Sequence, residues 1–203
     1  MKGLLDKINK LGRNVNVLSV WDIDDTLFES PNTFIYVISN KGQIVDKLST
    51  SKFNSHRLNP GEKYDFSEFK DSEIFFHGAS PISGNISKAK KVLESKNTML
   101  LLLTARGDFN NKSLFLKKFK KYGLDLNTPE SHVASSGNLG ISNTAQAKKN
   151  VLEQCLNTKK FTEVHMYDDD SRNLEAFKSL QKTYPDIKFK AFLAEHNKLI
   201  YRR

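Results

Sequence analysis

Short, continuous apolar runs alternate with longer helical stretches along this chain, and this alternation most limits what it can fold into. Apolar residues at consecutive positions are typical of strands buried on both faces, as in parallel sheets. Strands separated by helices form βαβ units, which place helices on both faces of a sheet. We therefore predict an α/β fold with a parallel sheet flanked by helices. Strands are expected at 15–21, 98–104, 132–134, 163–167 and 187–193, and helices at 86–96, 109–122, 144–156 and 171–184.

Residues 30–80 break this alternation. Two short segments, 34–39 and 44–48, flank the sequence Asn-Lys-Gly-Gln, which is a favourable hairpin turn, and an irregular stretch with several aromatic residues follows. We interpret this part as a small insertion between the first strand and its crossover helix. The chain then divides into a core, residues 1–29 and 81–203, and the inserted residues 30–80.

The composition limits the classes of partner. The 203 residues include 32 Lys and Arg against 23 Asp and Glu, and the net charge of +9 favours nucleotides, nucleic acid or other phosphate esters. A single cysteine, Cys155, excludes an internal disulfide and a cysteine-based zinc site. No run approaches the roughly 18 apolar residues of a membrane span, and the basic N-terminus lacks a small-residue cleavage site. We expect a mature, soluble, cytoplasmic protein without a membrane partner.

Four polar elements follow expected strands or lie near the start of a helix. They are Asp22-Ile23-Asp24-Asp25-Thr26-Leu27, Thr104-Ala105-Arg106, Lys148 with Lys149 beside it, and Asp168-Asp169-Asp170-Ser171-Arg172-Asn173. Because the carboxyl ends of parallel strands share one edge, these distant elements can converge. Carboxylates gathered there repel one another, and Mg²⁺, which prefers oxygen ligands, would relieve the repulsion. One carboxylate can attack phosphorus and a second can move the proton, while a lysine and a hydroxyl bind the phosphoryl group.

These elements resemble the four motifs of the haloacid dehalogenase-like (HAD) superfamily of phosphohydrolases, in family order from Asp22 to Asn173. Residues 17–27 match its first motif, an apolar strand followed by Asp-x-Asp-x-Thr-Leu. The resemblance implies a Rossmann-like sheet, Mg²⁺ as cofactor, and residues 30–80 as a small C1-type cap. The Thr-Ala-Arg and Tyr-Asp-Asp pieces are also similar to HAD-like proteins of tailed phages and to the phosphatase half of polynucleotide kinase-phosphatases. A phage-encoded protein would lie in the host cytoplasm.

The resemblance also implies roles for single residues. Asp22 would be the nucleophile and a metal ligand, and Asp24 the general acid and base, with its backbone carbonyl on the metal. Thr104 would hydrogen-bond the phosphoryl oxygens, and Lys148 would be the lysine of the third motif. Asp169 would be the remaining metal ligand of the fourth motif.

Some assignments keep an alternative. Lys149 could replace Lys148, and Asp168 lies beside the fourth-motif acid. Ala105 and Arg106 could bind substrate phosphate, although Arg106 could instead pair with a local acid such as Asp108. The lysines at 112, 117, 118, 120 and 121 could form a nucleic-acid stripe, but we interpret them as the solvent-facing side of an amphipathic helix.

The sequence therefore predicts a Mg²⁺-dependent phosphatase that hydrolyses phosphomonoesters through an aspartyl-phosphate intermediate, on nucleotides or nucleic-acid ends. A sugar-phosphate phosphatase or a phosphomutase is an alternative, and so is a non-catalytic module that binds phosphate or nucleic acid. Asp22 and Asp24 together favour an enzyme, because binding alone requires no nucleophile with an acid two residues away.

Overall fold

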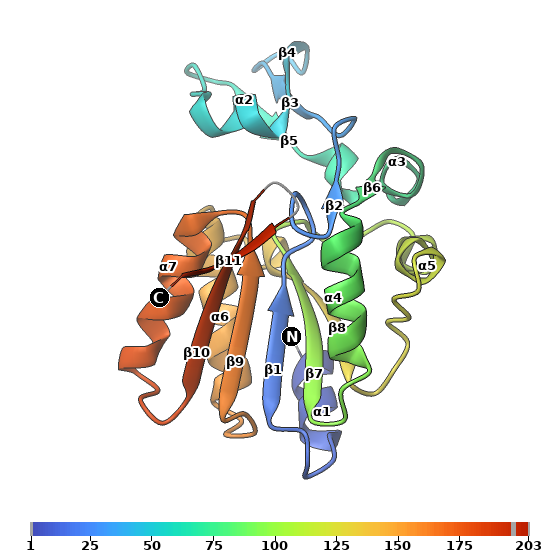
Figure 1. Cartoon of the computed structure of the whole chain (residues 1–203). Coiled ribbons are helices and arrows are strands. Elements are labelled where there is room, and N and C mark those ends of the chain that lie inside the picture. The colour runs from blue at the N-terminus through green and yellow to red at the C-terminus, as the bar shows by residue number, and fades with distance from the viewer. Residues whose placement is uncertain (1, 196–197, 203) are drawn as a thin grey trace.

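A computed structural model describes residues 2–195 and 198–202 of the chain. Its centre is a six-stranded sheet in the order β11-β10-β9-β1-β7-β8, parallel throughout except for the pair β10 and β11 (Figure 1). The strands are β1 (Val17–Trp21), β7 (Thr98–Thr104), β8 (Ser131–Ser135), β9 (Glu163–Asp168), β10 (Lys188–Glu195) and β11 (Lys198–Arg202). This mostly parallel sheet, flanked by helices, confirms the predicted α/β, Rossmann-like class.

The central strands form where apolar residues are consecutive. All seven residues of β7, TMLLLLT, are buried, because helices cover both faces of the sheet at this strand. In β9 buried residues alternate with half-buried ones. The buried face of β9 ends with Asp168, so this strand delivers a buried carboxylate to the carboxyl edge of the sheet.

Helices cover the sheet on both faces (Figure 1). Leu4, Val151 and Phe177 belong to the apolar cluster on one face, and Ile86 and Phe119 to the cluster on the other. These helices are α1 (Lys2–Lys10), α4 (Ser83–Leu93), α5 (Lys112–Lys121), α6 (Thr144–Leu156) and α7 (Ser171–Ser179). None of the helices in the described part of the chain has both the length and the apolar character that a bilayer crossing requires.

Side-chain caps set where two of these helices begin. Asn111 and Asn143 each accept a hydrogen bond from a backbone N–H three residues later, so α5 starts at residue 112 instead of 109 and α6 starts at 144 as predicted. Helix α7 ends earlier than predicted, and the 3-10 turn η3 (Leu180–Lys182) continues it. The short η2 turn (Ser136–Leu139) follows β8. Strand β11 was not predicted; it is mostly exposed and pairs antiparallel with β10.

The inserted segment, residues 30–80, stands over the carboxyl edge of the sheet (Figure 1). It contains a three-stranded antiparallel sheet in the order β4-β3-β5, with a small apolar core around Ile35, Val37 and Leu48. Strands β2 and β6 pair where the chain enters and leaves the segment. The elements are β2 (Phe28–Glu29), β3 (Ile35–Ile38), β4 (Ile44–Leu48), α2 (Thr50–Ser55), β5 (Lys63–Asp65), η1 (Ser67–Lys70), α3 (Ser72–Gly78) and β6 (Ser80–Pro81).

Helix α5 carries five lysines, of which four are exposed and one, Lys118, is buried. The Lys118 Nζ donates to the carbonyl oxygens of Phe76 at 2.6 Å and of Ala79 at 2.5 Å. The prediction that all five lysines face solvent is therefore wrong for Lys118. Its charge is buried at the contact between α5 and the end of α3, where two backbone carbonyls accept its hydrogen bonds.

Candidate active site

Neighbouring strands at the centre of the sheet end in polar residues. Asp22 follows β1, Thr104 ends β7, and Asp168 ends β9. Because β1 lies between β9 and β7, these three ends share the carboxyl edge of the sheet. Residues from both halves of the chain are therefore brought to one place.

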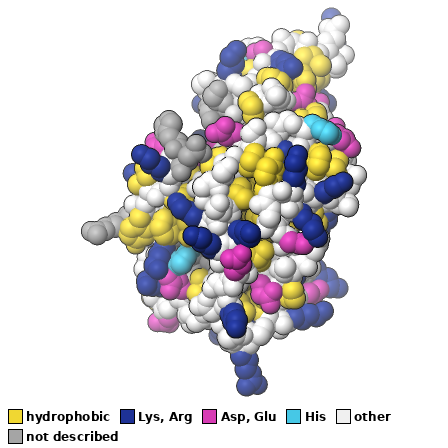
Figure 2. Space-filling model, turned by 45° about the vertical axis from the view of Figure 1, so that its right-hand side comes forward, with side chains coloured by type: hydrophobic (Ala, Val, Ile, Leu, Met, Phe, Trp, Pro, Cys, Tyr) yellow, Lys and Arg dark blue, Asp and Glu magenta, His cyan; other side chains and the backbone are white. Residues whose placement is uncertain are grey.

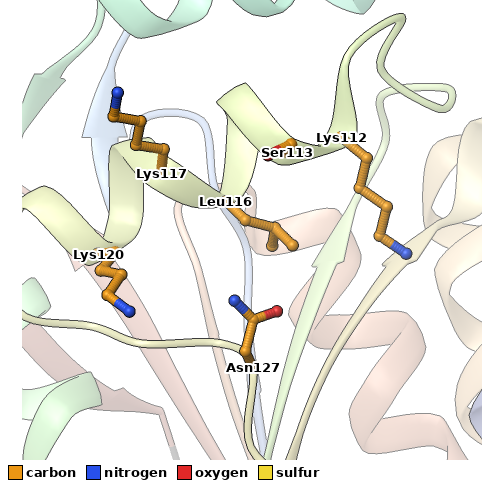
Figure 3. Close-up of a pocket in the computed structure, with 6 residues that line it drawn as sticks. All are labelled: Lys112, Ser113, Leu116, Lys117, Lys120 and Asn127. Carbon is orange, nitrogen blue, oxygen red and sulfur yellow. The ribbon is translucent and has the colours of Figure 1, made fainter.

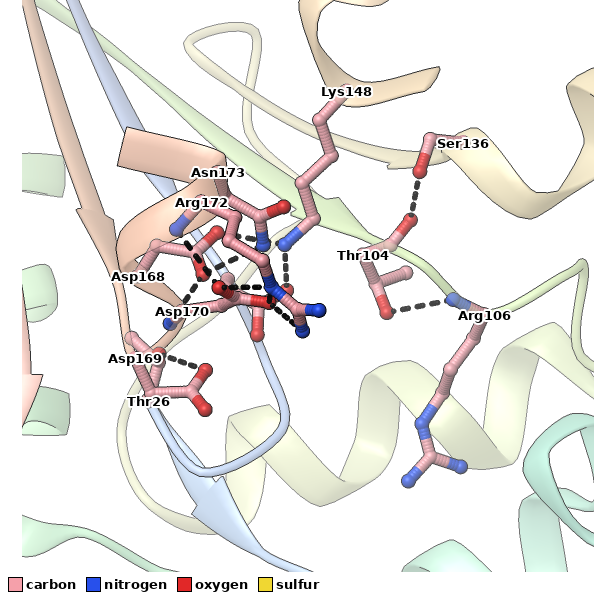
Figure 4. Close-up of polar contacts among 11 residues, drawn as sticks. Thr26, Thr104, Arg106, Ser136, Lys148, Asp168, Asp169, Asp170, Arg172 and Asn173 are labelled. Carbon is pink, nitrogen blue, oxygen red and sulfur yellow. Dashed lines mark hydrogen bonds and ion pairs between the residues drawn. The ribbon is translucent and has the colours of Figure 1, made fainter. Parts of the chain in front are cut away.

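Lys148 of α6 contacts two of these acids, and Figure 4 labels one of them, Asp168. Its Nζ lies 2.7 Å from Asp22 Oδ1 and 2.7 Å from Asp168 Oδ2, and the residue is only 2% exposed. Burial alone would lower the pKa of Lys148, but the carboxylates of Asp168 and Asp22 more than reverse this, so its pKa lies above the ordinary value. Lys149 instead donates to Ser179 of α7. Of the two lysines that the sequence left open, the structure brings Lys148 to the acids.

Asp169 completes a group of three acids. One carboxylate oxygen from each of Asp22, Asp168 and Asp169 lies within 4.8 Å of the other two. Burial raises the pKa of Asp22 well above its usual range against the opposing effect of Lys148, and the neighbouring acids add to the rise. Asp169 is partly exposed to solvent. Its pKa is nevertheless raised to about 7, mainly by desolvation and secondly by the negative charge of Asp168. A divalent cation with oxygen ligands would relieve this excess of negative charge.

Asp168 orients the lysine of the site. It is fully buried, and its Oδ2 accepts from Lys148 while its Oδ1 accepts from Asn173 Nδ2 at 2.8 Å and from the Asp170 N–H at 3.0 Å. The sequence analysis gave Asp168 only as the residue beside the fourth-motif acid, Asp169. The alternating burial of β9 is the signal that could have identified Asp168 as the buried partner.

The turn after β1 adds polar contacts. Asp25 has a φ of 55°, in the left-handed region that few residues other than glycine adopt. The buried Thr26 donates from its Oγ1 to Asp169 Oδ1 at 3.4 Å, and its carbonyl accepts from the buried Asn85 Nδ2 of α4 at 2.8 Å. These contacts tie the first motif to Asp169 and to α4. Sequence reasoning had no signal for Asn85.

Arg106, in the loop after β7, holds Asp24. Its Nε lies 2.7 Å from Asp24 Oδ2 and its Nη2 lies 2.5 Å from Oδ1, with the arginine side chain only 1% exposed. The same guanidinium donates to the Phe69 carbonyl at 3.1 Å and to Ser30 Oγ at 3.3 Å, both in the inserted segment. Arg106 thus pairs with Asp24 and not with Asp108, the local acid that the sequence offered. It links Asp24 to the inserted segment.

Thr104 is fully buried at the end of β7. Its Oγ1 accepts from the Arg106 N–H at 3.1 Å, so its own O–H is a donor, and its carbonyl accepts from Ser136 Oγ at 2.9 Å (Figure 4). A Cβ at Gly137 would lie 2.4 Å from the Ala105 carbonyl oxygen, so only glycine fits against this loop. Sequence reasoning missed both Ser136 and Gly137. Ala105 is exposed and has no polar side-chain atom, so only its backbone could contact a substrate.

The chain is similar to one known family over more than half of its length. A family model described as HAD domain family 1 in Swiss Army Knife RNA repair proteins matches residues 84–198, which is more than half of the chain. The matched range includes Thr104, Lys148 and Asp169, whereas Asp22 and Asp24 precede it. The search of curated proteins found no match.

Proposed function

Because the chain belongs to HAD domain family 1 in Swiss Army Knife RNA repair proteins, we propose that it is a Mg²⁺-dependent phosphatase that hydrolyses phosphomonoesters through an aspartyl-phosphate intermediate. The observation that carries this proposal is the contact of Lys148 with Asp22 and Asp168, beside Asp169. It supports the proposal because a carboxylate that could attack phosphorus lies next to an ammonium group that could bind the phosphoryl oxygens.

The acids fit a Mg²⁺ ion. Asp22 and Asp169 offer carboxylate oxygens, and the backbone carbonyl of Asp24 would add a third oxygen of the kind that Mg²⁺ prefers. Burial first, and then the neighbouring acids, raise the pKa of Asp22 and of Asp169, so a bound cation would help to keep both groups as carboxylates. Asp168 fits the role less well, because both of its oxygens accept hydrogen bonds. When bound, the ion would supply positive charge to the acids and to the phosphoryl oxygens.

Asp22 is the nucleophile of the proposed reaction. One of its carboxylate oxygens forms a bond to phosphorus while the bond from phosphorus to the ester oxygen breaks, and Asp24 gives that oxygen a proton. Water then attacks the phosphorus, Asp24 takes up its proton, and phosphate leaves with Asp22 regenerated. Lys148 has three N–H bonds and uses two of them on Asp22 and Asp168, so the third can bind a phosphoryl oxygen together with the hydroxyl of Thr104.

Arg106 acts in this proposal through Asp24. A guanidinium has five N–H bonds, and Arg106 makes two hydrogen bonds to Asp24, one to Phe69 and one to Ser30. Little donor capacity is left for a substrate phosphate, so we assign Arg106 to positioning Asp24. The two hydrogen bonds from Arg106 hold the carboxyl group of Asp24 in one orientation.

Nucleotides or nucleic-acid ends are the proposed substrates. The matched family is described from RNA repair proteins, and the net charge of +9 attracts polyanions. We assign the inserted segment, residues 30–80, to a small cap, because Ser30 and Phe69 within it contact the arginine that holds Asp24. A cap of this size leaves room at the site for the end of a polymer.

A substrate panel tests this function. Phosphate release is measured for a mononucleotide, a phosphorylated oligonucleotide and a sugar phosphate, with Mg²⁺ or with a chelator. We expect Mg²⁺-dependent release that favours the first two, abolished by Asp22→Asn and retained by Asp6→Asn, whose side chain is exposed on α1. Undiminished turnover by Asp22→Asn would overturn the mechanism, and a preference for the sugar phosphate would overturn the substrate class. No release from any substrate would favour the non-catalytic binding module.

A further inference from the structure

Helix α5 and the chain that follows it border an open groove on the side of the molecule next to β8. Two adjoining hollows of about 490 and 450 Å³ lie here, and both are lined by Lys112, Leu116 and Asn127 (Figure 3). We call the two hollows together the α5 groove. The lysines that line it are Lys7, Lys112, Lys117 and Lys120.

The charge of the α5 groove has one sign. Within the described ranges 2–195 and 198–202, no acidic residue lines either hollow. Lys112 makes no ion pair with any residue that the structure describes, and Lys120 pairs with Asp125 at 2.9 Å in a pair that is exposed and therefore weak. Helix α5 itself, KSLFLKKFKK, contains no acid. A helix side that only faces water commonly carries both signs of charge, so solvation alone does not explain this surface.

Gathering these cations costs stability in the free protein. Lys112 is the first residue of α5, where the helix dipole is already positive. Burial lowers the pKa of Lys7. The negative charge of Glu130 raises this pKa in part, and the positive charge of Lys112 lowers it further. His132 also lines the groove. Its pKa is lowered to about 4, mainly by burial and further by the positive charges of Lys7 and Lys112. An anionic ligand in the groove would relieve this repulsion.

The spacing of the groups suits a row of phosphates better than a single one. Lys112, Leu116 and Lys120 are four residues apart and lie along the side of the helix that faces Asn127 (Figure 3). Eight helical residues span about 12 Å, and stacked nucleotides advance about 3.4 Å each, so the two lysines would span about four nucleotides. Leu116 and the amide of Asn127 lie between them and offer an apolar contact and hydrogen bonds to sugars.

The groove is close to the candidate active site along the chain. Six residues lead from Arg106 to Lys112, so the two backbones are at most about 22 Å apart. That distance corresponds to on the order of six stacked nucleotides. Figure 2 turns this side of the molecule toward the viewer, and Lys and Arg side chains are spread over it.

We propose that the α5 groove binds the sugar–phosphate backbone of a single-stranded polynucleotide whose phosphorylated end reaches Asp22. This inference rests on the proposed phosphatase function and adds a binding surface to it. It also revises our interpretation of Lys112 and Lys120 as merely solvent-facing.

Binding of a fluorescently labelled single-stranded RNA of twelve nucleotides tests the proposal. Fluorescence anisotropy with the full chain at several salt concentrations compares wild type with Lys112→Ala/Lys120→Ala. The matched control is Lys178→Ala/Lys182→Ala, which removes two exposed lysines, also four residues apart, on and after α7. We expect the groove variant to bind roughly tenfold more weakly, with the dependence of log affinity on log salt shallower by about 0.7 for each lysine. The control should keep the wild-type values.

Hydrolysis separates this proposal from the phosphatase function. The groove variant should lose kcat/KM on a phosphorylated oligonucleotide and keep it on p-nitrophenyl phosphate, which is too small to reach the groove. Unchanged RNA binding by the groove variant, or an equal loss in the control, would overturn the groove assignment even if the chain is a phosphatase. A polyglutamate peptide that binds as tightly and depends on the same lysines would overturn the choice of a polynucleotide. RNA binding in the groove without hydrolysis of any substrate would support the groove and reject the phosphatase.

Discussion

Replacement of Lys148 by methionine removes the positive charge that contacts both Asp22 and Asp168. The aspartate side chains are 8% and 0% exposed, so water cannot take over the role of the lysine. Removal of one partner from a buried ion pair costs about 3–5 kcal/mol, and we take about 4 kcal/mol because burial is nearly complete. For a domain of this size, that loss lowers Tm by roughly 8–16 °C.

The loss of stability in Lys148→Met should depend on pH in a defined direction. In the wild type the pKa of Asp22 already lies well above its usual range, and removal of Lys148 raises it further. As the pH falls through such a raised pKa, the folded state takes up protons before the unfolded chain does, and the variant recovers stability relative to wild type. The stability gap is therefore largest near pH 7 and narrows toward pH 4.

Urea unfolding at pH 7 and pH 5, followed by circular dichroism, measures this gap. The matched control is Lys149→Met, because Lys149 donates to Ser179 Oγ at 3.0 Å and contacts no acid of the site. Lys149→Met should lower the free energy of unfolding by less than about 1 kcal/mol and should keep phosphatase activity. Lys148→Met should lose phosphatase activity. A Lys148→Met protein as stable as wild type at pH 7, or a gap that stays constant on acidification, would refute the reasoning.

Two further predictions concern Arg106 and His132. Arg106→Lys keeps the positive charge but loses the two-point contact with Asp24. We expect kcat to fall on the order of 100-fold while KM stays nearly constant. A raised KM at constant kcat would instead indicate that Arg106 binds the substrate. The pKa of His132 is lowered from 6.5 to about 4 in the folded protein. As the pH falls, the unfolded chain therefore takes up a proton at this histidine before the folded protein does. The free energy of unfolding of the wild type should decrease by up to about 2 kcal/mol between pH 6.5 and pH 4, after allowance for partial exposure. Thermal melts of His132→Asn should lack this loss, and an equal loss in both proteins would argue against the cationic surroundings of His132.

The polar residues that follow apolar runs were predictable from the sequence. Asp22 and Thr104 each come at the end of a continuous apolar run, and parallel topology then requires their strand ends to share an edge. The choice between Lys148 and Lys149 was not predictable in the same way. Adjacent residues of a helix point their side chains in different directions, and the packing of the helix decides which of them faces the site. The packing of α6 against α7 and the sheet directs Lys149 to Ser179 and leaves Lys148 at the acids.

Two contacts between segments that are distant in the sequence could not be predicted. Arg106 lies 82 positions from Asp24, and no local pattern links an arginine after one strand to an acid after another. The burial of Lys118 likewise depends on the carbonyl of Ala79, 39 positions away. Both contacts involve the inserted segment or its edge, where the βαβ alternation that guides the rest of the prediction is absent.

The fate of the phosphoryl group in a single turnover tests most directly whether Asp22 is the nucleophile. A substrate labelled in its phosphoryl group is mixed with excess enzyme and quenched in acid within the first turnover, and the protein is then digested and mapped. We predict protein-bound label on the peptide that contains Asp22, and none in Asp22→Asn. Release of phosphate without labelled protein at any time, or label on a different residue, would contradict this prediction.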